Sequence, residues 1–197
     1  MQIKNEATRK ILTPKVLSIS AALVALGTLT HFIKLFRMPM GGSITLFSML
    51  FVAAIGWMFG PLAGLMGGLA YSLLQIIFDL YIVHPVQFLI DYFIAFVALG
   101  TVAGFYKNFR NGYIMAVLAR YFCHVVSGYV FFREYLPDDF FLTPYISGAA
   151  LDWAYSLIYN AMYILPEAVV TVIILTVPAV RNTLDNLKKT HGYKYSA

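Results

Sequence analysis

The polar side chains best suited to chemistry in this sequence lie on segments that are otherwise apolar. Asp91 ends the run PVQFLID, with Gln87 four residues before it, Tyr92 beside it and no Lys or Arg within fifteen residues on either side. Residues four apart share one face of a helix. A carboxylate at the centre of a membrane helix costs at least about 2.5 kcal/mol, so Asp91 should face a protein interior or a watery cavity. We expect its partner there to be a ligand.

Two further groups combine polar and aromatic residues. One steps by fours along a single segment through Arg120, His124, Gly128 and Phe132, with the glycine leaving a gap where a ligand could approach the backbone. The other opens the last apolar segment, DWAYSLIYN, from Asp152 to Asn160. A carboxylate, an amide, phenols, an imidazole and flat rings suit a small cationic heteroaromatic ligand. Aromatic faces attract rings and cations by about 0.5 to 2 kcal/mol per contact.

Several of these residues have structural alternatives. Arg120 could pair with Asp91 or with backbone carbonyls, and His124 is equally compatible with a satisfied core position and with a ligand contact. Glu167 follows a proline, which favours structural hydrogen bonding near a helix break. His84 is expected to cap a loop. Four aromatic residues of the last segment also suit an interfacial belt, namely Trp153, Tyr155, Tyr159 and Tyr163.

Composition indicates what kind of element must carry these residues. The chain has 197 residues, of which 60% are hydrophobic and 12% charged, and its mean hydropathy is +0.76. These values lie outside the usual range for soluble domains. Apolar stretches long enough to span a bilayer, about twenty residues each, occupy residues 14–33, 43–59, 62–80, 86–105, 113–132 and 151–177. We predict an all-α polytopic membrane protein, a six-helix bundle forming one integral membrane domain over residues 1–197.

Loop charges predict the orientation of the bundle. Ten Lys and Arg residues fall in the N-terminal segment, the 107–110 loop and the C-terminal tail, against three in the other loops. The positive-inside rule therefore places both termini in the cytoplasm. The opposite loops collect five acids, which favour a cation at the outer mouth. These acids are Asp79, Glu134, Asp138, Asp139 and Asp152.

Small residues indicate close helix packing, and other features argue against a transporter that works without partner subunits. Gly60, Gly64 and Gly68 form a ridge for a neighbouring helix, and Ala21 and Ala25 form a flat face for another helix or another subunit. The sequence contains no clear internal repeat, although many secondary transporters are built from repeats. It also contains no phosphate-binding loop, no HExxH motif and no GxSxG motif. We expect no catalytic residues, no metal and no cofactor in this chain.

Motifs along nearly the whole chain carry a family resemblance. They are MPMGGS at 38–43, HPVQFLIDY at 84–92, Ala119-Arg120 with His124 and Ser127-Gly128, YSLIYN at 155–160 and LPE at 165–167. Their order resembles the thiamine-specific substrate-binding components (S components) of energy-coupling factor transporters, known as the ThiT family. The resemblance implies a six-helix protein that captures thiamine from outside with high affinity. It also implies a partner module of one transmembrane coupling protein and two ATPases, docked at Ala21 and Ala25.

The resemblance also implies the residues that bind the vitamin. Asp91 and Asn160, with Tyr155, would hold the aminopyrimidine, while Phe132 and His124 would flank the rings. The implied set is Tyr81, Asp91, Tyr92, His124, Gly128, Phe132, Tyr155 and Asn160.

The chain departs from the family pattern at three positions. Asp91 stands where some members have glutamate, Phe132 where tryptophan is expected and Phe93 where proline is common. An S component for another cationic or heteroaromatic vitamin is one alternative. A self-sufficient proton-coupled carrier, using Asp91, Arg120 and Glu167 as a relay, is the other.

Overall fold

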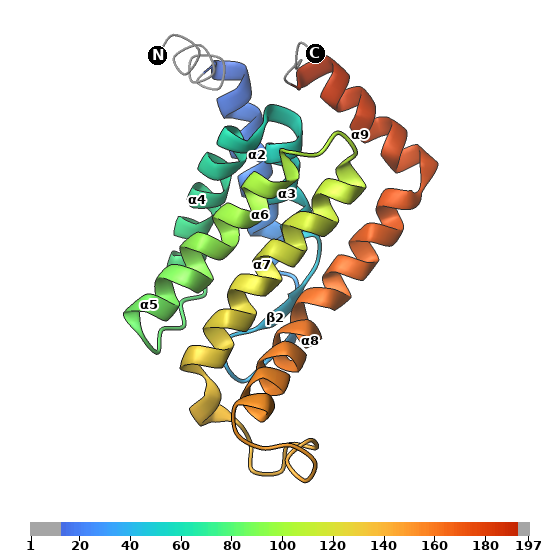
Figure 1. The fold of residues 1–197 in the computed structure, drawn as a ribbon. Coiled ribbons are helices and arrows are strands. Elements are labelled where there is room, and N and C mark those ends of the chain that lie inside the picture. The colour runs from blue at the N-terminus through green and yellow to red at the C-terminus, as the bar shows by residue number, and fades with distance from the viewer. Residues whose placement is uncertain (1–12, 193–197) are drawn as a thin grey trace.

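The computed structural model describes residues 13–192 as a bundle of long helices with a small hairpin (Figure 1). One end of the bundle carries the start of the first described helix and the end of the last one, and we call it the termini end. The other end carries the hairpin and the long 136–148 loop, and we call it the hairpin end. In chain order the elements are α2 (Pro14–His31), β1 (Lys34–Arg37), β2 (Ser43–Thr45), α3 (Ser48–Phe59), α4 (Pro61–Phe78), α5 (Pro85–Phe88), η1 (Leu89–Ile94), α6 (Ala95–Ala103), α7 (Phe109–Phe131), η2 (Arg133–Tyr135), α8 (Ala149–Thr176) and α9 (Pro178–His191).

Local sequence explains where these helices begin. The side chains of Thr13 and Asn108 accept backbone N–H bonds at the starts of α2 and α7, satisfying donors that a helix leaves unpaired. Prolines occupy the first turns of α2, α4, α5 and α9, where a missing N–H is harmless. The expected capping role of His84 is confirmed, because its Nδ1 accepts the Val86 N–H at 3.1 Å.

Within residues 13–192, four helices are long and apolar enough to cross a membrane: α4, the continuous α5–η1–α6 segment, α7 and α8. The chain is therefore a multi-pass membrane protein. The predicted count of six crossing helices is not confirmed. Helix α2 is outside this set, with Lys15 and His31 near its ends. Helix α3 has 12 residues, about 18 Å at 1.5 Å per residue, which is shorter than a hydrocarbon core of about 30 Å.

The predicted second helix is wrong in its first part. Residues 43–45 form strand β2, which pairs antiparallel with β1 in the register Lys34↔Thr45, Phe36↔Ile44 and Arg37↔Ser43. Gly41 has a φ of 89° and Phe47 a φ of 63°, and such left-handed conformations interrupt a helix. The apolar stretch is therefore split into a strand and a shorter helix that starts at Ser48.

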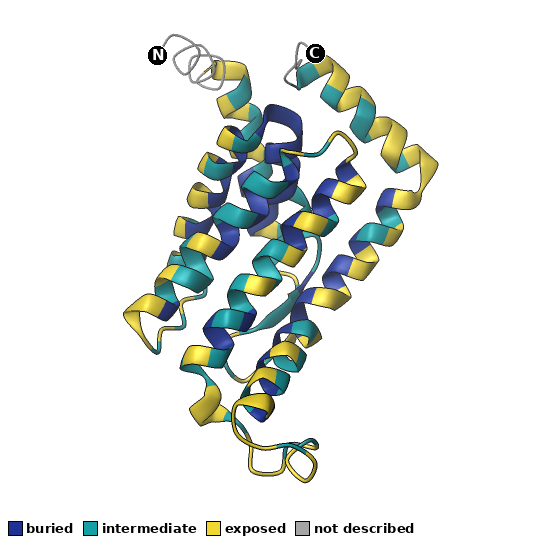
Figure 2. Ribbon diagram, viewed as in Figure 1, coloured by how far each residue is buried: buried dark blue, intermediate teal, exposed yellow. Residues whose placement is uncertain are grey.

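Glycines bring α3, α4 and α6 into backbone contact toward the termini end. A Cβ on Gly56 or Gly64 would overlap the carbonyl oxygen of Gly100, and one on Gly68 would lie 2.5 Å from the Phe96 carbonyl oxygen. The predicted ridge is thus confirmed at Gly64 and Gly68, whereas Gly60 forms the turn before α4 with a φ of 95°. Most of α3 is buried by this packing (Figure 2).

Candidate functional site

A cavity of about 980 Å³, counted to its open mouth, lies at the hairpin end. The hairpin segment 40–45 lines one side, and residues of α4, η1, α7 and α8 line the others. All eight residues implied by the family resemblance contribute to its wall: Tyr81, Asp91, Tyr92, His124, Gly128, Phe132, Tyr155 and Asn160.

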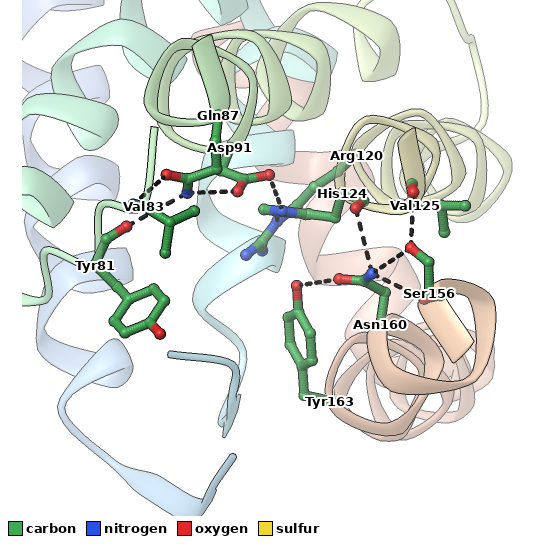
Figure 3. Close-up of polar contacts among 10 residues, drawn as sticks. All are labelled: Tyr81, Val83, Gln87, Asp91, Arg120, His124, Val125, Ser156, Asn160 and Tyr163. Carbon is green, nitrogen blue, oxygen red and sulfur yellow. Dashed lines mark hydrogen bonds and ion pairs between the residues drawn. The ribbon is translucent and has the colours of Figure 1, made fainter. Parts of the chain in front are cut away.

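Asp91 lies in η1, one wide π-helical turn inside an otherwise α-helical segment, and such turns occur frequently at functional sites. Its Oδ2 accepts a hydrogen bond from Gln87 Nε2 at 2.7 Å, and its Oδ1 lies 3.0 Å from Nδ1 of His124 (Figure 3). The predicted shared face of Gln87 and Asp91 is confirmed. Two protein side chains therefore contact the carboxylate, which still lines the cavity, and the expected ligand at Asp91 stays a prediction.

Arg120 does not form the ion pair with Asp91 that the sequence allowed. Its Nε donates to Nε2 of His124 at 3.3 Å, and its guanidinium lies 4.6 Å from the centroid of the Phe96 ring. The arginine therefore reaches Asp91 through the imidazole that lies between them (Figure 3).

Gln87 and Tyr92 support the segment that carries Tyr81. Oε1 of Gln87 accepts the Val83 N–H at 3.1 Å. The Tyr92 hydroxyl accepts the Tyr81 N–H at 2.7 Å and donates to the Asp79 carbonyl at 2.8 Å. Tyr92 was grouped with the ligand-binding residues from the sequence, but its hydroxyl is occupied by backbone. Its ring is what remains for a ligand.

Asn160 and Gly128 join α8 to α7. Nδ2 of Asn160 donates to the Ser156 carbonyl at 2.9 Å and lies 3.3 Å from the His124 carbonyl, while its Oδ1 accepts from Tyr163 at 2.7 Å. A Cβ on Gly128 would overlap the hydroxyl of Ser156. The Cβ side of Gly128 is therefore filled by a serine, while the glycine itself lines the cavity, and the approach of a ligand to its backbone stays a prediction.

Aromatic rings supply much of the remaining wall. Tyr81 and Phe132 are nearly parallel, with ring centroids 6.2 Å apart and an interplanar angle of 20°. Tyr155, Tyr159 and Tyr163 line the cavity and contact one another in sequence. The alternative of an interfacial belt is wrong for these three. Trp153, the fourth candidate, is outside the cavity lining and stacks on Tyr129 at 4.1 Å.

The hairpin segment closes over these rings. The Met40 N–H donates to the Tyr159 hydroxyl at 3.1 Å, and a Cβ on Gly42 would lie 2.7 Å from the Tyr163 ring. Glu167 accepts from the Thr45 hydroxyl at 2.5 Å and from the Met49 N–H at 2.9 Å. The structural role predicted for Glu167 is confirmed, with the added finding that it attaches β2 and the start of α3 to α8.

Two groups in the cavity wall were missed by sequence reasoning. His31, which no sequence pattern explained, lies 3.1 Å from Asp79, and Lys34 pairs with the same carboxylate at 2.5 Å. Burial alone would raise the pKa of Asp79, but the hydrogen bond and charge of Lys34, with a contribution from His31, hold it below its usual value. Their spacing, 31 and 34 against 79, gives no sequence signal.

Gln75 is the second missed group. It lines the cavity, is 2% exposed and has no hydrogen-bond partner for its Nε2 within residues 13–192. An amide one turn before Asp79 in an apolar helix was the available signal. No cluster of three or more His, Cys, Asp or Glu side chains that could hold a metal is found in that same part of the chain.

Comparisons with known proteins all match this chain to thiamine transporters. A family model described as thiamine transporter protein matches residues 17–186. ThiT of Bacillus subtilis is 36% identical over 155 residues, which cover 70% of this chain and 75% of that protein. ThiT of Lacticaseibacillus paracasei is 30% identical over 131 residues, covering 58% and 60% respectively. A solved structure of ThiT from Listeria monocytogenes shares the fold, with a TM-score of 0.64, 23% identity and coverage of 84% of this chain and 96% of that one.

Proposed function

Because this chain belongs to the thiamine transporter protein family, we propose that it binds thiamine in the cavity at the hairpin end and serves as the substrate-capturing subunit for uptake of the vitamin. The observation that carries this proposal is the pairing of one oriented carboxylate with flat aromatic walls in a single cavity. It is the chemistry that a cationic heteroaromatic ligand requires. The chain itself catalyses no reaction.

Thiamine offers a permanently charged thiazolium ring and an aminopyrimidine ring. The carboxylate of Asp91 supplies the opposite charge, and its two oxygens are held by Gln87 and His124. The faces of Tyr81 and Phe132 provide parallel surfaces on which a flat ring can stack. Asn160 and Tyr155 contribute polar atoms on the α8 side.

Asn160 acts in this proposal chiefly by fixing Tyr163 and the α7 backbone. Both ends of its amide already have protein partners. A direct bond from the ligand to Asn160 therefore requires one of those partners to be shared.

We place the hairpin end outside the cell and the termini end in the cytoplasm, and we assign high affinity to the outward-facing cavity. The excess of basic residues at the termini end supports this orientation. An enclosing wall and a preformed set of contacts around Asp91 support tight binding. The hairpin closes the cavity on the outer side in this arrangement.

Uptake needs a partner that supplies energy. We assign this role to an energy-coupling module of one transmembrane protein and two ATPases, docked on α2. Ala21 and Ala25 are both exposed and lie one turn apart, so they form a flat surface that another helix can approach closely. Ala21→Trp should abolish uptake without loss of thiamine binding. Ala22→Trp, on an equally exposed neighbour outside this stripe, is the matched control.

The test of the ligand assignment is a thermal-shift panel on the purified protein in detergent. Thiamine should stabilise the protein most, by about 2.7 kcal/mol at one hundred times its Kd, and its pyrimidine half should stabilise it less. A larger shift with riboflavin, pyridoxine or biotin would overturn the assignment to thiamine in favour of another vitamin.

A proton-coupled carrier predicts transport by this chain alone in proteoliposomes, lost when the proton gradient is dissipated. The relay it requires is interrupted in the structure. Glu167 is bound by Thr45 and Met49, and no ion pair between Glu167 and Arg120 is found in residues 13–192. Uptake only in the presence of the coupling module decides for the S component.

A further inference from the structure

Arg120 belongs to a motif of the family resemblance but not to the binding residues that the resemblance implies, yet a hydrogen-bonded chain connects it to Asp91. Its Nε is 3.3 Å from Nε2 of His124, and Nδ1 of the same ring is 3.0 Å from Oδ1 of Asp91 (Figure 3). Phe96 holds the guanidinium from the α6 side, with the cation 4.6 Å from the ring centroid. The two nitrogens of the His124 ring therefore each have a partner, Arg120 at Nε2 and Asp91 at Nδ1.

The donor and acceptor roles along this chain follow from chemistry. A guanidinium stays protonated in proteins and can only donate, so Nε2 of His124 must be the acceptor. A neutral imidazole carries one N–H. Its proton is then on Nδ1, where it donates to Asp91, while Gln87 donates to the other carboxylate oxygen.

We propose that Arg120 is a positioning residue that holds His124 in its neutral Nδ1–H tautomer, which keeps Asp91 anionic and oriented for a cationic ligand. The ligand part of this inference rests on the proposed function. Without the Arg120 donor, Nε2 of His124 is free to take a proton. The resulting imidazolium would neutralise Asp91 and compete with the cation that the site binds.

The surroundings of His124 leave Arg120 as the group that controls this proton. From η1, Asp91 faces the ring, and from α8 the Tyr163 ring centroid lies 6.1 Å away. Helices α3 and α6 contain no titratable residue. The other two cavity acids are occupied elsewhere, Asp79 by Lys34 and His31 and Glu167 by Thr45, Ser48 and Met49.

The first test uses ligand-free protein and needs no thiamine. The sequence has four histidines, so 15N-histidine NMR in detergent is tractable, and the His124 signals are identified by their loss in His124→Gln. We expect a single protonated nitrogen, Nδ1, from pH 7.5 to pH 5.5. In Arg120→Met the same ring should become doubly protonated at the acid end of this range, because Nε2 is free to take a proton once its donor is lost. An Nε2–H tautomer, or the same titration in both proteins, would overturn the proposal.

The second test compares thiamine affinity at pH 5.5 and pH 7.5. The wild-type Kd should change by less than about twofold, whereas Arg120→Met, in which Nε2 of His124 is free to take a proton, should bind thiamine about five to ten times more weakly at the lower pH. Arg120→Lys, which keeps a donor, should retain the flat profile. The double variant Arg120→Met/His124→Gln should lose the pH dependence again.

A purely structural role for Arg120 predicts an equal loss of affinity at both pH values, and that result would contradict the proposal. Failure of the wild-type protein to bind thiamine would count against the proposed function alone. The NMR experiment would still decide the tautomer.

Discussion

The two ends of the bundle are built on different principles although the same helices run through both. At the termini end, α3, α4 and α6 meet backbone to backbone at Gly56, Gly64 and Gly100. At the hairpin end, the continuations of α4 and α6 are joined by side chains such as Tyr92, whose hydroxyl bonds the backbone at Asp79 and Tyr81, and a cavity lies among them. Glycine contact leaves no volume for a ligand, whereas polar side chains hold helices together across one.

The transition between the two regions occurs within single helices. On α4, the glycines stop at Gly68, and Tyr71 and Gln75 follow on the way to the cavity. On the neighbouring segment, Gly100 lies toward the termini end and Asp91 toward the hairpin end. Stability and ligand binding should therefore be separable by position along a helix.

The largest effect is expected where two backbones touch. Gly100→Ala would place a Cβ against the Gly64 carbonyl oxygen, and neither backbone can move without shifting a whole helix. We expect a loss of about 3 kcal/mol or more in stability, measured as a fall in the midpoint of thermal unfolding in detergent. The affinity of the remaining folded protein for thiamine should change little.

Gly27→Ala is the matched control for this variant. Its Cβ would approach Ser48 O and the Tyr71 ring at 3.3 Å, which a small shift can accommodate. Equal destabilisation by both variants would contradict the difference expected between overlap of two backbones and a contact that a small shift relieves.

Glu167 tests how strongly polar side chains hold the hairpin end. Glu167→Ala removes the acceptor of the Thr45 hydroxyl and of the Met49 N–H. The Thr45 hydroxyl keeps its bond with Ser48, whereas the buried Met49 N–H is left unsatisfied, at a cost of about 1 to 3 kcal/mol. Thermal unfolding should show this loss. Glu167→Gln, which keeps one acceptor oxygen, should lose clearly less, and a Gln variant as unstable as the Ala variant would contradict the role assigned to these hydrogen bonds.

The sequence was most informative where its signals are local. Apolar length located the helices, and four-residue spacing brought Gln87 to Asp91 and His124 to Arg120. Contacts between distant segments were not predictable. The pairing of His31 with Asp79 and the filling of the Gly128 gap by Ser156 depend on how helices are placed against each other, and a hydropathy pattern does not contain that placement.

The hairpin shows a different limit of the sequence. Residues 43–59 carry no charge and are mostly apolar, so composition alone extends the helix to Ser43. The observed break follows from backbone conformation at Gly41 and Phe47. A phenylalanine in the left-handed region is held by its surroundings and has no sequence signature.

Asp91 provides the binding counterpart of the glycine experiment. Asp91→Asn removes the charge but preserves the size of the side chain, so we expect thiamine affinity to fall by about 1.5 to 3 kcal/mol, or roughly 10- to 150-fold. Isothermal titration of the purified variant measures this change. The unfolding midpoint of the ligand-free protein should move far less than in Gly100→Ala. Unchanged affinity would remove Asp91 from the site and end the functional distinction between the two ends.

The smallest effect is expected at the rim of the cavity, where Lys34 joins the hairpin to Asp79. The side chain of Asp79 is 29% exposed and that of Lys34 is 8% exposed, so water and salt screen the pair only in part, and Asp79→Asn should cost about 1 kcal/mol at pH 7. Because the folded state lowers the pKa of Asp79, this contribution is present above the unfolded pKa, about 3.9. It is lost as the pH falls through the lower folded value. The difference in unfolding midpoint between wild type and variant should therefore be constant from pH 8 to pH 5 and shrink only in more acidic solution. A difference that grows on acidification would mean that Asp79 is stabilised as the neutral acid, and it would contradict the ion pair with Lys34.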